Sequence, residues 1–172
     1  MTILRTLVAE GLVERIAIAI SEMEGFNKPG SRAQRQNNPG NLRSWGKTPV
    51  LDGFANFPTP AEGWRALRKQ VWRNVDRGLT LYEFFGGKRI TDTLTVTHPD
   101  GTVEEIEKKA TVVYAGYAPD ADGNRSRHYA EFVARRVGIP VDVPLPEAFA
   151  RCDVAAREHA NDRMEGVQWK AR

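Results

Sequence analysis

The sequence predicts a mainly α (α+β) domain that carries a small inserted β-hairpin. Apolar residues recur at helical spacing, with capping signals, in several stretches, and one stretch alternates apolar residues with threonines as strands do. The chain has 172 residues, of which 41% are hydrophobic, enough for one domain with a proper core. Because no linker, internal repeat or low-complexity tract interrupts the chain, we expect residues 1–172 to form a single domain.

The first helix is expected over residues 3–24. Val13, Ile16 and Ile20 fall on one apolar stripe of such a helix, while Gly11 leaves open a break in it. Gly25 supplies a helix stop. From there to residue 58 the sequence is typical of a loop, with short strands expected near residues 48–51 and 54–57.

Two further helices have clear starts. In the segment 59–62 (TPAE) the Thr can cap, the Pro suits the first helical position and the Glu completes a capping box. This helix is expected to end near Gly78. The segment 80–83 (TLYE) repeats the capping-box pattern and predicts a short helix over residues 81–85.

Residues from about 90 to 108 differ in kind from the rest of the chain. Apolar residues alternate with threonines before the turn signal Asp100-Gly101 and resume after it, which predicts a β-hairpin inserted into the helical domain. A helix over about 126–137 follows. The last helix is expected over about 146–164.

Charge and composition exclude several classes of protein. The net charge of +3 is too small to argue for a nucleic-acid partner, although it favours encounter with an anionic polymer. No apolar stretch is long enough to span a bilayer, and Glu10, Glu14 and Arg15 interrupt the N-terminal segment that could otherwise be a signal peptide. The single cysteine, Cys152, excludes an intramolecular disulfide. We therefore expect a protein made in the cytoplasm without a signal peptide and without membrane insertion.

The sequence implies no metal and no cofactor. His98, His128 and His159 show no metal-ligand spacing with one another or with Cys152. The chain has no phosphate-binding loop, dinucleotide fingerprint or G-x-S-x-G motif.

Two glutamates at the end of the first helix differ in the face that they occupy. Glu24 continues the apolar stripe, whereas Glu22 lies about 200° away around the helix and is expected in water. Partial burial and the negative end of the helix dipole both favour the protonated form of Glu24. A protonated glutamate is what a general acid in glycoside cleavage requires. A helix-end glutamate that reaches water or pairs with an arginine is the equally compatible alternative.

The loop after this helix is unusually rich in amide side chains. The segment 38–41 (NPGN) suits a type II turn, but turn chemistry does not account for all of the Asn and Gln residues over 34–41. Amides both donate and accept hydrogen bonds, which complements the hydroxyl and N-acetyl groups of amino sugars. Local bonds that rigidify the loop explain any single one of them equally well. Trp45, beside this loop, is the candidate for stacking on a sugar.

Four motifs in the same order resemble a lysozyme-like superfamily of phage and bacterial proteins related to soluble lytic transglycosylases and goose-type lysozymes. The motifs are E-G-F at the end of a helix, then QRxNNPGNLR, GFAxFPTPAEGWRAL and GYAPDADGNRSRHYAEFVARRVGI. The resemblance spans roughly Ile16 to Leu145, with a gap at the hairpin. It implies a lysozyme-like helical domain.

The resemblance also implies an activity: cleavage of the β-1,4 glycosidic bonds of peptidoglycan glycan strands, as a lytic transglycosylase or a muramidase. Glu24 would be the catalytic general acid, because members carry a glutamate at the end of a core helix before a small residue and an aromatic one. The implied substrate-binding residues are those of the cleft floor, Asn38, Asn41 and Arg43, and those of the opposite wall, Tyr117 and Asn124.

The outcome of cleavage depends on a second carboxylate. After Glu24 the next acidic residue is Asp52, which precedes Gly53 in an expected turn and is the candidate for that role. With one clear acid, assistance by the sugar's own groups favours the lytic transglycosylase over the hydrolase.

A rival from another class is a non-catalytic lysozyme-fold component of a phage particle, or a peptidoglycan-binding module, because a fold does not fix a function. As an enzyme the chain is expected to be a monomer that acts on the cell wall or in the periplasm, either as an endolysin after holin release or as part of a virion.

Overall fold

The structure, a computed structural model, describes residues 3–91, 93–107, 110–118, 120, 123 and 125–165. Helices and short antiparallel strands are mixed, which confirms the α+β class. The elements in chain order are α1 Ile3–Met23, α2 Arg32–Arg35, β1 Val50–Leu51, β2 Phe54–Ala55, α3 Pro60–Asp76, α4 Leu81–Gly86, β3 Gly87–Ile90, β4 Thr93–Thr97, β5 Val103–Glu107, β6 Thr111–Ala115, α5 Ser126–Val137 and α6 Leu145–Glu165. No helix in these ranges is long and apolar enough to cross a membrane.

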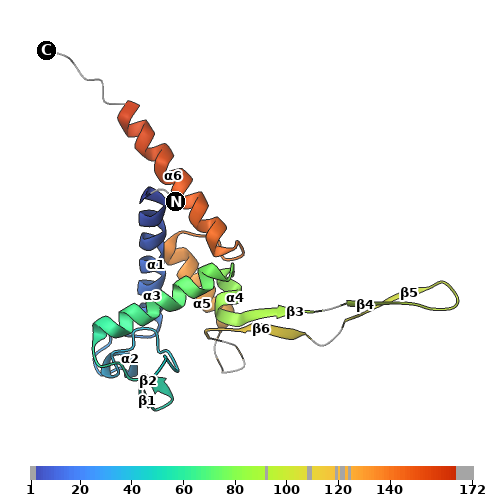
Figure 1. The fold of residues 1–172 in the computed structure, drawn as a ribbon, viewed down its shortest axis with the longest axis horizontal. Coiled ribbons are helices and arrows are strands. Elements are labelled where there is room, and N and C mark those ends of the chain that lie inside the picture. The colour runs from blue at the N-terminus through green and yellow to red at the C-terminus, as the bar shows by residue number, and fades with distance from the viewer. Residues whose placement is uncertain are drawn as a thin grey trace.

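Helix α1 is the centre of the core, and α3, α5 and α6 all pack against it (Figure 1). Val13, Ile16 and Ile20 are almost completely buried, as the apolar stripe predicts. The helix continues through Gly11 without a break. Trp64 and Trp72 on α3 are partly buried against the same core.

Two ion pairs tie α1 to its neighbours. Arg68 on α3 donates to both carboxyl oxygens of Glu14, one of them at 3.0 Å. Arg136 on α5 donates to both oxygens of Glu22, at 2.8 and 2.9 Å. The expectation that Glu22 lies in water is therefore corrected: its side chain is 28% exposed and paired. In both pairs the hydrogen bond from arginine holds the pKa of the glutamate below its ordinary value.

The helix starts follow the capping signals. Thr59 accepts a hydrogen bond from the Glu62 amide at the start of α3, and Thr80 and Glu83 form the full capping box of α4. Helix α2 is a helix that the sequence did not predict. It has only four residues, started by the side chain of Ser31, too short for an apolar period to reveal it.

The inserted hairpin is longer than predicted and projects from the body as an arm (Figure 1). Strands β4 and β5 pair over 93–107, as expected, but β3 and β6 extend the arm so that Gly87 pairs with Ala115. Apolar side chains along the arm are exposed, among them Val103 and Val112. The base is tightly packed, since a Cβ on Gly116 would collide with backbone atoms of residues 85–87.

Replacing residues 93–107 by a short Asn-Gly turn is expected to leave the thermal unfolding midpoint within about 4 °C of the parent, because among the described residues β4 and β5 pack chiefly on each other. Gly116→Ala, at the base, is expected to lower the midpoint much further. Differential scanning calorimetry of the two variants checks this. Equal losses would mean that the distal arm contributes to the core.

Candidate functional site

Glu24 is the first residue after α1, and its backbone still belongs to the helix. Its amide donates to the Ile20 carbonyl at 3.0 Å. Gly25 follows with φ +69°, a left-handed conformation that glycine adopts without strain and that ends the helix. The carboxyl of Glu24 is thus carried at a rigid helix end, at the edge of the core.

Two side chains from distant parts of the chain hold this carboxyl. Asn41 Nδ2 donates to Glu24 Oε2 at 2.6 Å, and the Tyr129 hydroxyl donates to Oε1 at 2.7 Å. One donor comes from the amide-rich loop and the other from α5. Because each carboxyl oxygen accepts its own hydrogen bond, the pair fixes both the position and the rotation of the carboxyl.

The two tyrosines of the site stay protonated. Burial raises the pKa of the Tyr129 hydroxyl, and the nearby charge of Glu24 raises it further. Burial and the same charge also raise the pKa of Tyr117 well above its ordinary value. Tyr117 donates to the Gly40 carbonyl, and its ring packs edge-on against Phe84 and Phe85 at 5.5 and 5.9 Å between centroids. Tyr117 therefore fastens the amide-rich loop to the core.

The loop can approach the core this closely only because two of its contacts are made by glycines. A Cβ on Gly40 would lie 2.5 Å from the Tyr117 hydroxyl and 2.7 Å from Leu67 Cδ1. A Cβ on Gly63, in the first turns of α3, would collide with the Asn37 carbonyl. Packing, rather than a type II turn, thus explains Gly40.

The left-handed residues of this loop are asparagines. Asn37 has φ 51° and Asn41 has φ 44°, a region that Asn tolerates better than most residues. A turn over residues 38–41 is present, since the Asn41 amide donates to the Asn38 carbonyl at 3.0 Å, but Gly40 lacks the positive φ of the expected type II turn. The left-handed backbone of Asn41 turns its side chain toward Glu24.

Asn38 serves the loop itself, which corrects the expectation that it contacts substrate. Its side chain is fully buried. Its Nδ2 donates to the carbonyls of Leu42 and Ala55 at 2.9 and 2.8 Å, and its Oδ1 accepts from the Leu42 amide at 2.9 Å. Two of these bonds join the loop to Leu42, which directly follows it, and the third joins the loop to β2. Asn38 therefore positions Asn41 and does not face a ligand.

A hollow of about 290 Å³ opens beside Glu24. Its lining is more polar than apolar and consists of Glu24, Arg32, Asn41, Leu42, Arg43, Ser44, Phe54, Gln70, Gly116, Tyr117 and Ala118. Three of the expected binding residues, Asn41, Arg43 and Tyr117, thus lie together with Glu24. Asn124 lies outside the described residues.

Asp52 does not share this hollow. It is exposed in the turn between β1 and β2, with φ 52°, and the described lining contains Glu24 as its carboxylate. Asp52 serves the turn between the two strands. Its position does not support the expectation of a second catalytic carboxylate.

Sequence reasoning missed Tyr129 and Gln70. Tyr129 occupies the buried face of α5 together with Ala130 and Val133, and a hydroxyl on an apolar helix face needs a buried partner. This rule could have identified Tyr129 as a candidate from the sequence. Gln70 follows from no local pattern, because it lines the hollow only through the packing of α3.

The described residues include no group of three or more His, Cys, Asp or Glu side chains that could hold a metal ion. His98 lies far out on the arm beside Glu104, at 3.1 Å. At the site, a carboxyl held by two donors lies next to an open polar hollow with amide and guanidinium groups, an arrangement that suits acid–base chemistry.

Searches against models of protein families, curated proteins and solved structures found no match to this chain.

Asn38→Ala is expected to lower the free energy of unfolding by about 3 kcal/mol or more, because three buried backbone groups lose their partner. Asn41→Ala should cost only about 1 kcal/mol, since its side chain bonds a partly exposed carboxyl. Urea unfolding of both variants measures the difference. A larger loss for Asn41→Ala would reverse the roles assigned to the two residues.

Proposed function

We propose that the protein cleaves the β-1,4 glycosidic bonds of peptidoglycan glycan strands, with Glu24 as the general acid. The observation that carries the proposal is the carboxyl of Glu24, held by Asn41 and Tyr129 at the edge of an open polar hollow. The four motifs that resemble lysozyme-like proteins meet here: they supply Glu24, the amide-rich loop, α3 with Gly63, and the segment that carries Tyr117 and Tyr129.

The first chemical step is a proton transfer from Glu24 to the glycosidic oxygen. As the bond to the anomeric carbon breaks, an oxocarbenium-like sugar forms and Glu24 becomes a carboxylate. Asn41 and Tyr129 already point at its two oxygens. Donors placed where charge develops lower the barrier without reorganising, so both side chains assist this step.

The second step must quench the sugar cation. The described lining holds no carboxylate besides Glu24, so the sugar's own N-acetyl group or 6-hydroxyl assists. The Glu24 carboxylate can accept the proton of the 6-hydroxyl, which forms a 1,6-anhydro ring. This favours a lytic transglycosylase over a muramidase, in which a water molecule would take the place of the hydroxyl.

Substrate recognition falls to the neutral amides and the guanidinium groups. Asn41 and Gln70 can bond sugar hydroxyl and N-acetyl groups, and Arg32 and Arg43 lie over the Phe54 ring, 3.5 and 5.6 Å from its centroid, at the rim. The net charge of +3 favours encounter with an anionic wall. As a monomer, the protein would reach the wall after holin release or as a virion component.

One observation favours the rival, a non-catalytic protein that binds peptidoglycan or builds a phage particle. Both oxygens of Glu24 accept hydrogen bonds from side chains, as a purely structural carboxylate does. The open polar hollow beside it weighs against that role, because a structural carboxylate needs no access to solvent.

Glu24→Gln is expected to reduce clearing of cell walls at least about 100-fold, since the amide cannot supply the proton. Its binding to sedimented walls should persist. Turbidity of a wall suspension and a co-sedimentation assay measure the two quantities. Glu22→Gln is the matched control, two residues away on another face, and should stay within a few-fold. A parent protein that binds walls but never clears them would establish the rival.

The products of digestion are expected to carry 1,6-anhydro ends. Mass spectrometry of the released muropeptides distinguishes them from hydrolysis products, which are heavier by one water. Hydrolysed ends would contradict the transglycosylase, and loss of activity in Asp52→Asn as well would replace it by a two-carboxylate hydrolase.

A further inference from the structure

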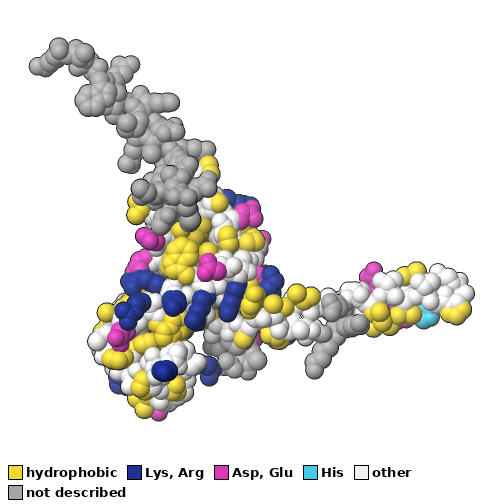
Figure 2. All heavy atoms as spheres, in the orientation of Figure 1, with side chains coloured by type: hydrophobic (Ala, Val, Ile, Leu, Met, Phe, Trp, Pro, Cys, Tyr) yellow, Lys and Arg dark blue, Asp and Glu magenta, His cyan; other side chains and the backbone are white. Residues whose placement is uncertain are grey.

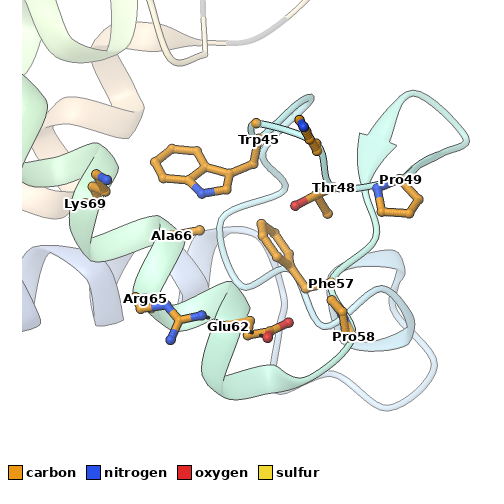
Figure 3. A pocket seen from close by; sticks show the side chains of 11 residues that line it. Trp45, Thr48, Pro49, Phe57, Pro58, Glu62, Arg65, Ala66 and Lys69 are labelled. Atoms are coloured by element: carbon orange, nitrogen blue, oxygen red, sulfur yellow. Dashed lines mark ion pairs between the residues drawn. The ribbon is translucent and has the colours of Figure 1, made fainter.

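A second and larger hollow, of about 520 Å³, lies between α3 and the loop that carries Trp45 (Figure 3). The chain segment that lines the Glu24 hollow with residues 41–44 lines the second hollow with residues 45–49. Helix α3 likewise lines the first with Gln70 and the second with its neighbour Lys69. The two hollows are thus lined by adjacent stretches of the same loop and of the same helix, although no described residue lines both.

One side of this hollow is apolar. Trp45, Phe57, Pro49 and Pro58 form it, and the nitrogen-bearing edge of the indole is turned toward the interior in this view (Figure 3). The Arg73 guanidinium lies 4.5 Å from the centroid of the Trp45 ring, which helps to fix the indole. Within the described part of the chain the indole N–H has no acceptor.

The other side is basic. Arg65 and Lys69 of α3 line it, Lys47 adds a third basic residue from the loop of Trp45, and Glu62 is the single acidic residue of the described lining. Glu62 is a poor partner for Arg65: the two groups are 3.9 Å apart, with side chains 39% and 76% exposed, and such exposed pairs contribute little. The side chains of Lys47 and Lys69 make no ion pair with any described residue.

The basic residues of α3 continue past the hollow. Arg65, Lys69, Arg73 and Arg77 recur every four residues, so they follow one side of the helix. Figure 2 shows Lys and Arg side chains in a row across the body of the molecule. The positive potential around the hollow thus exceeds what the net charge of +3 suggests.

This lining offers cationic donors, an unused N–H and an apolar wall, but few acceptors. It fits a ligand with several carboxylates and short aliphatic groups better than a neutral sugar, which needs acceptors as well as donors. We propose that the Trp45 hollow binds the acidic peptide stems that branch from the glycan strand. The proposal rests on the proposed function, which places the glycan itself beside Glu24.

The test titrates the full-length protein with an N-acetylated stem peptide, Ala-γ-D-Glu-diaminopimelate-D-Ala, by isothermal calorimetry. The double variant Arg65→Gln/Lys69→Gln is expected to bind about tenfold more weakly, because two charged donors are lost. Arg89→Gln/Arg135→Gln removes the same total charge from exposed positions elsewhere and should bind as the parent does. The peptide with amidated carboxylates should not bind.

A second readout locates the peptide. The indole N–H cross-peak of Trp45, assigned through Trp45→Phe, should shift on addition of the peptide in a nitrogen–proton correlation spectrum. No shift, no binding by the parent, or equal weakening in both double variants would overturn the inference.

The outcome is independent of catalysis. Glu24→Gln is expected to bind the peptide with the parent's affinity. A parent that clears walls but ignores the peptide would refute the stem site alone, and one that binds the peptide but never clears walls would refute the proposed function alone.

Discussion

The close approach of residues 37–41 to helix α3 is the constraint on which the site depends. Gly63 admits the Asn37 carbonyl against the helix, and Gly40 admits the Tyr117 hydroxyl. With the loop held there, Asn41 reaches Glu24. A side chain at either glycine would push the loop outward and separate the donor from the carboxyl, although neither glycine touches Glu24.

The amide side chains of this loop have two different roles: some support the backbone, and one lies at the site. Asn38 and Gln36 are buried, and both donate to backbone carbonyls, Gln36 to that of Leu51 at 2.9 Å. Asn41 lies at the edge of the hollow. Neighbouring amides thus have different roles: Asn38 is buried with both its amide nitrogen and its carbonyl oxygen bonded to the backbone, while Asn41 bonds the Glu24 carboxyl.

Local sequence signals predicted the helices, whereas contacts between residues far apart in the chain determine the geometry of the site. The caps at Thr59 and Thr80 and the stripe on α1 depend on residues only a few positions apart, so the sequence reveals them. The bond from Tyr129 to Glu24 and that from Arg136 to Glu22 join residues more than 100 positions apart, which no local pattern encodes. For the same reason Asn41 and Asn38 could be identified as a group but not told apart.

The arm joins the body at a tightly packed base. Gly87 and Gly116 lie against each other there, and the chain enters and returns at neighbouring positions of one antiparallel pair. An insertion whose two ends already meet imposes no spacing on the rest of the fold. The body can therefore accept a shorter arm, a longer one or a foreign module at this point, which makes the hairpin a natural graft site for adapting the protein to new surroundings.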